Sequence, residues 1–227
     1  NTATAAVKGS VTYNDDNTAL KVTCGTNTVG ANIALGTESF TMSFDSKIYK
    51  NAFAGNAGYE LVTSTIGSGD SDAGTFQFSA RGDKKSLRIA VGTNNGQFDY
   101  DLAVGKIKTD EWQRFTFVVE RGVAFDTEKG TETIRMTLYI DGVKIQTKQR
   151  TDITKNQVLG NGTIYFGGNL PWSTKTSEID NFTLVRRALT DREIYALPSY
   201  YDEIASVVGW DAEDITIDFK SVVKDQP

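Results

Sequence analysis

Short stretches in which apolar and polar residues alternate recur along most of the chain. Phe40, Met42 and Phe44 occupy every second position of one stretch, and residues 115–119 repeat the pattern. Such alternation is typical of a β-strand with one buried face. Further stretches of this kind, bounded by Gly, Asn, Asp or Ser, cover residues 10–13, 19–23, 59–65, 74–80, 86–91, 97–104, 163–166 and 177–185. The pattern therefore predicts many short strands.

Two hairpins are indicated by what separates neighbouring strands. Asp141-Gly142 stands between the apolar runs 134–140 and 143–148. Asp-Gly suits a type I′ turn, which needs positive φ at both central residues, so this is a strong hairpin signal. The polar run 14–17 separates the first two predicted strands and predicts a second hairpin.

Helical signals are confined to the C-terminal part of the chain. Thr190 and Glu193 have the spacing of a capping box, in which each side chain bonds the other residue's backbone amide. Residues 200–208 could form an amphipathic helix, and residues 215–219 alternate like a strand. Without any strand–helix–strand rhythm, the chain is predicted to be all-β. We expect an antiparallel two-sheet β-sandwich with one or two short C-terminal helical segments.

Composition limits the function more than the fold. The 227 residues are 39% hydrophobic, enough to bury a core, and no apolar run is long enough to span a bilayer. The formal charge is −5 and no basic stripe is present, so nucleic acid is not an expected partner. Cys24 is alone and cannot form an intrachain disulfide. The chain contains no histidine, which excludes Ser-His-Asp and Cys-His catalysis and the usual zinc sites within it.

Four features occur in an order that points to one family. Trp112 opens a strand, Leu-Tyr-Ile-Asp-Gly covers residues 138–142, Gly167 and Gly168 follow a Tyr-Phe strand, and residues 179–194 begin Ile-Asp-Asn-Phe and end in a Thr-x-x-Glu-Ile helix start. Together they resemble the laminin-G-like, concanavalin A-like jelly rolls of bacterial secreted or surface proteins. The resemblance implies a domain over residues 1–197, a C-terminal extension over 198–227, and a core position for Trp112. The extension either packs on the sandwich or leads to a neighbouring domain.

The resemblance also implies a function. Domains of this type accompany glycoside hydrolases, sialidases and adhesins, so we expect a non-catalytic, lectin-like carbohydrate-binding module. Its partners would be a glycan and other domains of the same polypeptide, in a secreted or cell-surface protein from which this sequence is an excised domain. Two alternatives stay open, because one fold carries many functions. They are a structural or adhesive domain that contacts protein and a divergent glycoside hydrolase.

Aromatic residues supply the first candidate ligand contacts. Trp172 lies in the polar segment 169–176 between predicted strands, where an exposed indole could stack on the flat C–H face of a sugar. Packing against the edge of the core is the simpler explanation for this tryptophan. Tyr59 and Tyr100 are predicted to extend the same aromatic platform.

A structural calcium site is the expected cofactor site. The resemblance implies that Asp180 contributes to it, together with oxygens from near the N-terminus. Calcium takes six to eight oxygen ligands, so Asp15 and Asp16 are the natural additional candidates. The plainer alternative is that Asp180 accepts a hydrogen bond from a neighbouring amide and that the other two carboxylates are solvated in a turn.

Two short matches carry little weight. Glu178-Ile-Asp180 resembles the first half of a glucanase catalytic strand, yet residues 181–183 provide no second glutamate for the acid/base role. Arg81-Gly82-Asp83 spells the integrin tripeptide but is also ordinary turn chemistry between two strands. Neither match is expected to mark a functional site.

Overall fold

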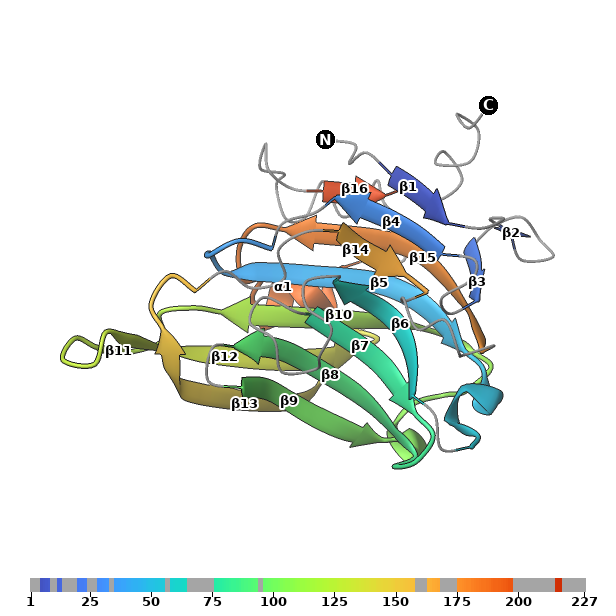
Figure 1. Cartoon of the computed structure of the whole chain (residues 1–227), viewed down its shortest axis with the longest axis horizontal. Coiled ribbons are helices and arrows are strands. Elements are labelled where there is room, and N and C mark those ends of the chain that lie inside the picture. The colour runs from blue at the N-terminus through green and yellow to red at the C-terminus, as the bar shows by residue number, and fades with distance from the viewer. Residues whose placement is uncertain are drawn as a thin grey trace.

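Figure 1 shows the computed structural model of the chain as two facing, twisted sheets with little helix. The structure describes residues 5–8, 12–13, 20–23, 28–32, 35–55, 58–64, 76–93, 96–157, 163–167, 175–197 and 215–217. Among these residues, no helix is long and apolar enough to cross a membrane.

Seven of the described strands form the first sheet, and every neighbouring pair in it is antiparallel. In spatial order they are β1 (Ala5–Lys8), β4 (Thr28–Asn32), β14 (Thr163–Phe166), β6 (Gly58–Ser64), β7 (Phe76–Arg81), β8 (Ser86–Thr93) and β9 (Gly96–Ala103).

Nine described strands form the second sheet, again antiparallel throughout. The main path is β11 (Phe125–Asp126), β12 (Thr131–Ile140), β10 (Trp112–Glu120), β5 (Phe40–Ile48), β15 (Thr176–Val185), β3 (Leu20–Thr23) and β2 (Thr12–Tyr13). In addition, β13 (Val143–Thr154) pairs with β12, and β16 (Ile215–Ile217) pairs with β15. The predicted two-sheet antiparallel sandwich is confirmed.

A layer of phenylalanine rings fills the space between the sheets. Phe78 of the first sheet lies with its ring centroid 5.1 Å from Phe44 and 5.3 Å from Phe117 of the second. Phe166 and Phe182 make a similar edge-to-face pair across the sandwich at 4.8 Å. All five side chains are at most 1% exposed. Each buried aromatic side chain removes a large apolar area from water, and edge-to-face pairs add a further contribution.

Several local signals of the sequence are found where they were predicted, and others lie outside the described residues. Asp141 and Gly142 have φ values of 51° and 77°, as a type I′ turn requires, and they join β12 to β13. Strands β2 and β3 form the predicted N-terminal pair, although residues 14–17 lie outside the described part of the chain. The helix predicted at 200–208 also lies outside it, whereas β16 covers part of the strand predicted at 215–219.

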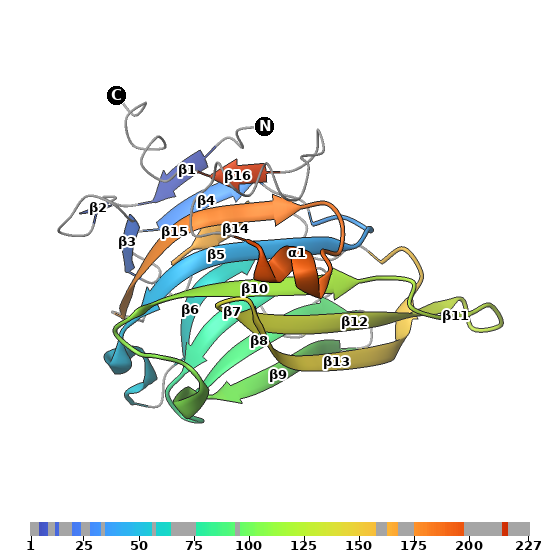
Figure 2. The same cartoon turned by 180° about the vertical axis from the view of Figure 1, so that it is seen from behind.

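The one α-helix among the described residues, α1 (Asp191–Tyr195), covers part of the outer face of the second sheet (Figure 2). A small satellite core lies beneath it, formed by Val118, Tyr139, Val185, Leu189 and Ile194. The predicted capping box is present, because the Glu193 amide donates to the Thr190 hydroxyl and the Thr190 amide donates to the Glu193 carboxylate. A five-residue helix is too short to be stable alone, so this cap and the satellite core hold it in place.

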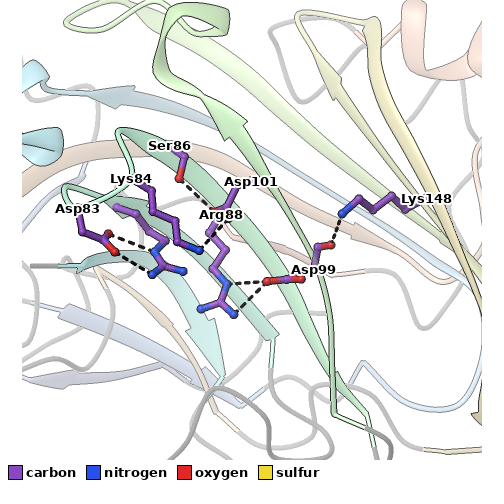
Figure 3. A network of polar contacts seen from close by, with 8 residues as sticks. Asp83, Lys84, Ser86, Arg88, Asp99, Asp101 and Lys148 are labelled. Atoms are coloured by element: carbon purple, nitrogen blue, oxygen red, sulfur yellow. Dashed lines mark hydrogen bonds and ion pairs between the residues drawn. The ribbon is translucent and has the colours of Figure 1, made fainter.

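The two sheets are also joined along one edge. The ammonium group of Lys148, on β13, donates to the backbone carbonyl of Asp99, on β9, at 2.7 Å (Figure 3). The Asp99 carboxylate in turn accepts from Arg88, at 3.1 Å from Nε. Charged side chains along an edge strand such as β13 also discourage pairing with another chain.

The Arg81-Gly82-Asp83 tripeptide lies at the turn between β7 and β8. Its arginine Nε and Nη2 donate to the Asp83 carboxylate at 3.3 and 3.0 Å. This bond lowers the pKa of Asp83. The neighbouring Lys84 lies 3.6 Å from the carboxylate of Asp101 in the same surface network (Figure 3). The tripeptide therefore closes a turn, as its sequence predicts.

A buried ion pair anchors the segment between β10 and β12. The side chains of Arg121 and Glu132 are each 5% exposed, and the arginine Nε donates to the carboxylate at 3.1 Å. The second carboxylate oxygen accepts from the Gly122 amide at 2.9 Å. The guanidinium also donates to the Gln157 carbonyl, and the Arg121 amide donates to the Ser39 hydroxyl. This network fixes the base of the hairpin that carries β11.

Breaking this ion pair is expected to destabilise the domain strongly. In Glu132→Gln the buried guanidinium loses its counter-charge, which typically costs about 3–5 kcal/mol. Urea unfolding measures the change in the free energy of unfolding. Glu120→Gln is the matched control, because the Arg135–Glu120 pair is about one third exposed on each side and should cost under about 1 kcal/mol. Equal effects of the two substitutions would contradict the prediction.

The capping carboxylate predicts a pH dependence of stability. Hydrogen bonds from Arg187, and then from Thr190, lower the pKa of Glu193 from 4.5 to about 2. Its contribution is therefore complete above pH 4.5 and is lost as the pH falls toward 2. We expect Glu193→Gln to cost roughly 1 kcal/mol at pH 7 and progressively less below pH 4.5.

Urea unfolding at several pH values between 2 and 7 measures this difference. Arg192→Gln, at an exposed position of the same helix, serves as the control and should show no such trend. A cost of Glu193→Gln that is constant across the whole range would show that the carboxylate charge plays no part in the cap.

Candidate ligand groove at one end of the sandwich

A groove of about 900 Å³ opens at the end of the sandwich where β5 stops and β10 starts. Its walls come from two short 3₁₀ turns, η1 (Lys50–Phe53) and η2 (Val104–Lys106), and from the residues around them. The lining residues are Tyr49, Lys50, Asn51, Phe53, Ala54, Lys85, Val104, Gly105, Ile107, Thr109 and Asp110. Ligand pockets commonly measure about 300–1,000 Å³, so a small ligand fits.

Two hydrogen bonds of Asp110 join the η2 side of the groove to the end of β5 and to η1. The Asp110 amide donates to the Ile48 carbonyl at 2.9 Å, and the Lys50 amide donates to the Asp110 carboxylate at 3.2 Å. Asp110 has a φ of 64°, an uncommon value for a residue other than glycine. The two sides of the groove are thus joined to each other as well as to the sheet.

Lys85, in the β7–β8 turn of the first sheet, contacts both η1 and η2. Gln113 links the η2 side of the groove to the β12–β13 turn. The Lys85 ammonium donates to the Phe53 carbonyl at 2.5 Å, and the Val104 amide donates to the Lys85 carbonyl at 2.9 Å. Gln113, which is 5% exposed, accepts from the Lys108 amide and donates to Asp141. The groove is therefore largely pre-formed, which reduces the entropy lost when a ligand binds.

Trp112 lies on the surface, two residues after the lining residue Asp110 in the sequence. Its exposed fraction is 41%, so the core position implied by the family resemblance is wrong. The reason is the period of the strand. Phe115 and Phe117 face the core, and residues an odd number of positions away face outward, as Trp112 does together with Arg114.

A row of polar side chains continues from Trp112 across the outer face. Trp112 pairs with Lys47, and Lys47 pairs with Glu178 on the next strand. The Lys47 ammonium lies 3.7 Å from the Glu178 carboxylate and 5.6 Å from the centre of the Tyr49 ring. The Tyr49 hydroxyl also donates to Glu178. These contacts orient the Tyr49 ring, which is half-buried at the edge of the groove.

The next row on this face is an ion-pair cluster. Arg114 Nε and Nη2 donate to both oxygens of Asp45, at 2.8 and 3.0 Å. The Asn181 amide nitrogen Nδ2 donates to Asp45 at 2.7 Å, and its backbone amide donates to Asp180 at 2.9 Å. Asn181 has a φ of 51° and occupies a bulge between Asp180 and Thr183. Each carboxylate in these two rows is thus engaged by a donor.

No described contact places the residues that were predicted from sequence to bind ligand in this groove. Trp172 lies outside the described residues. For the two tyrosines the structure describes only the backbone. Tyr59, in β6, pairs with Ala80, and Tyr100, in β9, pairs with Ile89. Their role as sugar contacts stays a prediction.

Calcium also stays a prediction. Asp15 and Asp16 lie outside the described residues, and Asp180 accepts from the Asn181 amide. Within the described ranges, no group of three or more His, Cys, Asp or Glu side chains could hold a metal ion. Asp45, which pairs with Asp180 across the strands, is already held by Arg114. The described side chains therefore do not by themselves fit a calcium site.

The groove itself was missed by sequence reasoning, although one signal was present. Tyr49 and Phe53 follow directly after an alternating strand, in a segment that is too short for a further strand and contains two polar residues, Lys50 and Asn51. Aromatic rings just beyond the end of a strand are expected at the rim of a sandwich, where loops carry function. The opposite wall gave no such signal.

Comparisons with known proteins agree with this architecture. The binding domain of botulinum neurotoxin serotype D superposes with a TM-score of 0.64 at 18% identity, over 85% of this chain and 45% of that one. The serotype D ligand-binding domain solved with N-acetylneuraminic acid gives 0.61 at 17% identity over the same shares. The neurotoxin DC binding domain solved with rat synaptotagmin II gives 0.59 at 19% identity.

At these identities the likeness shows the fold alone, and the chain spans less than half the length of these neurotoxin domains. No curated protein matches the sequence significantly. A laminin-G-type sequence model, described as the concanavalin A-like lectin/glucanases superfamily, matches residues 26–195, which is most of the chain. The chain therefore belongs to the concanavalin A-like lectin/glucanase superfamily, as a domain of the laminin-G type.

Proposed function

We propose that this domain is a non-catalytic module that binds glycan in the groove at the end of the sandwich. The observation that carries the proposal is a pre-formed groove lined by Tyr49 and Phe53, followed two residues after its lining residue Asp110 by the exposed Trp112. A tryptophan side chain that is 41% exposed leaves a large apolar surface in water, which a stacking ligand would cover. Sugars have flat C–H faces that suit such a surface.

The groove also offers polar groups that can hydrogen-bond to sugar hydroxyls. The side chains of Asn51, Thr109 and Asp110 line it and combine donors with acceptors. A few polar groups around an apolar floor are typical of small-ligand sites, in which the polar groups fix orientation. Affinity of one such module is expected to be modest and to rise when neighbouring modules bind the same glycan.

A binding role is favoured over catalysis by the state of the carboxylates. Glycoside hydrolases use two carboxyl groups about 5–9.5 Å apart on either side of the scissile bond. Glu178 is engaged by Tyr49 and Lys47, and Asp45 by Arg114. Both are committed to contacts within the sheet, which is unlike a pair that exchanges protons with a substrate.

The neurotoxin binding domains lend general support, since one was solved with a sugar and another with a protein. The match covers 45% of each of those chains, so neither ligand is assigned to the matched half. The proposal therefore depends on the groove of this chain. A secreted or surface location, and other domains of the same polypeptide as neighbours, complete the proposal and follow from the family resemblance.

Removing the indole should weaken glycan binding with little effect on folding. We expect Trp112→Ala to reduce affinity for a bound glycan by roughly tenfold or more, or about 1.4 kcal/mol, and Trp112→Phe to retain part of it. A glycan array identifies the ligand, and calorimetry measures its dissociation constant. Running both with calcium and with a chelator also tests the predicted metal.

The matched control is Phe125→Ala, which removes an aromatic side chain that is 57% exposed on β11, and β11 lies at the other end of the sandwich (Figure 1). This variant should bind as the wild type does, and thermal melting should show that all variants are folded. A blank array for the folded wild-type protein would count against glycan recognition and favour the protein-binding alternative. Equal losses in Trp112→Ala and Phe125→Ala would remove the groove from the proposal.

A further inference from the structure

We infer that the groove selects glycans that carry a carboxylate, such as those with uronic or sialic acid units. The inference rests on the proposed glycan-binding function and specifies its ligand class. It comes from four lysines, which we call the lysine collar: Lys50 and Lys85 line the groove, and Lys106 and Lys108 each follow a lining residue in the sequence.

The collar residues come from three separate segments that the fold brings to one end of the sandwich. Lys50 begins η1 and Lys85 ends the β7–β8 turn, and both line the groove. Lys106 ends η2, directly after the lining residue Gly105, and Lys108 follows the lining residue Ile107. All four side chains are exposed. Figures 1 and 2 agree that η1, η2 and the start of β10 lie at the same end.

The collar lysines lack the carboxylate partners that several other lysines and arginines have on the described surface. On the first sheet, cations are matched by carboxylates, as in Arg88 with Asp99 and Lys84 with Asp101 (Figure 3). By contrast, no collar lysine forms an ion pair with any residue that the structure describes. Unmatched charge around a concave site attracts a ligand of the opposite sign.

Acidic residues also stand near the collar, but the groove lining itself carries an excess of positive charge. Asp110 lines the groove, and its carboxylate accepts from the Lys50 backbone amide. Glu111 is exposed next to it. Among the residues that line the groove, two lysines stand against one carboxylate, a local charge of about +1 on a chain whose formal charge is −5. The groove lining is therefore positive on a chain that is negative as a whole.

One collar ammonium is held in place on the groove wall. The Lys85 Nζ donates to the Phe53 carbonyl, which uses one of its three N–H donors and leaves two. A lysine whose position is fixed by the protein loses less conformational entropy when it binds a carboxylate. Lys50 begins the same η1 turn that ends at Phe53 and also lines the groove, so its ammonium can approach the same ligand.

The test compares one glycan in two forms, a uronic-acid-containing oligosaccharide and the same oligosaccharide with its carboxyl groups reduced to alcohols. Calorimetry measures the dissociation constants of both for the wild-type domain at low and at high salt. We expect about tenfold tighter binding of the acidic form at low salt. The preference should shrink at high salt, because the Debye length falls to about 3 Å at 1 M.

The decisive variant is Lys50→Gln with Lys85→Gln, which removes two charges and keeps side chains of similar polarity. It should weaken binding of the acidic form more than binding of the reduced form, so that the preference falls to within about twofold. Lys129→Gln with Lys155→Gln is the matched control at the opposite end of the sandwich, beside β11 (Figure 1), and should keep the full preference.

Three outcomes would overturn the inference. If the wild type binds both forms equally through Trp112, the carboxylate preference is wrong and the proposed function stands. If it binds neither form nor any array glycan, the proposed function itself fails. If the preference survives in the Lys50/Lys85 variant, or is lost in the Lys129/Lys155 control, the collar does not select the carboxylate.

Discussion

Burial of one aromatic layer between the two sheets is the constraint on which the other features depend. Phe44, Phe78 and Phe117 interlock there, so the distance and angle between the sheets are set by ring packing. Close-packed interiors tolerate little displacement, and the strand ends inherit that rigidity. The groove occupies the end at which β5 leaves this layer after Ile48. A recognition surface built on loops is thereby held almost as firmly as the core.

Much of the fold could be predicted because its determinants are local. Alternation in β5 and β10 reflects a face buried against a second sheet, and it is legible within a few residues. The Asp141-Gly142 turn and the Thr190–Glu193 cap are likewise set by backbone conformation and hydrogen bonds between near neighbours. Such signals depend on near neighbours in the sequence and not on contacts with distant parts of the chain.

The site could not be predicted in the same way, since its walls come from residues 49–54, 85 and 104–110, which meet only in the folded state. Trp112 shows a different kind of failure. Trp112 is three positions before the buried Phe115, and in a strand an odd spacing places two side chains on opposite faces. This spacing indicated an outward side chain, whereas the family resemblance implied a core position. Gln113 has the opposite character, being a polar residue that is buried because it joins two loops. The strand period was the better guide for Trp112, and no local pattern revealed Gln113.

The position of β5 at the centre of the second sheet has a consequence for the order of events during synthesis. One of its neighbours is β15, and Thr41 bonds the backbone of Arg187 and Leu189 across 146 and 148 residues. A ribosome adds about 5–20 residues per second, so β15 is synthesised many seconds after β5. During that time it is an apolar strand with one edge open. Domains with such long-range pairing fold slowly, which makes this nascent chain a natural client for chaperones.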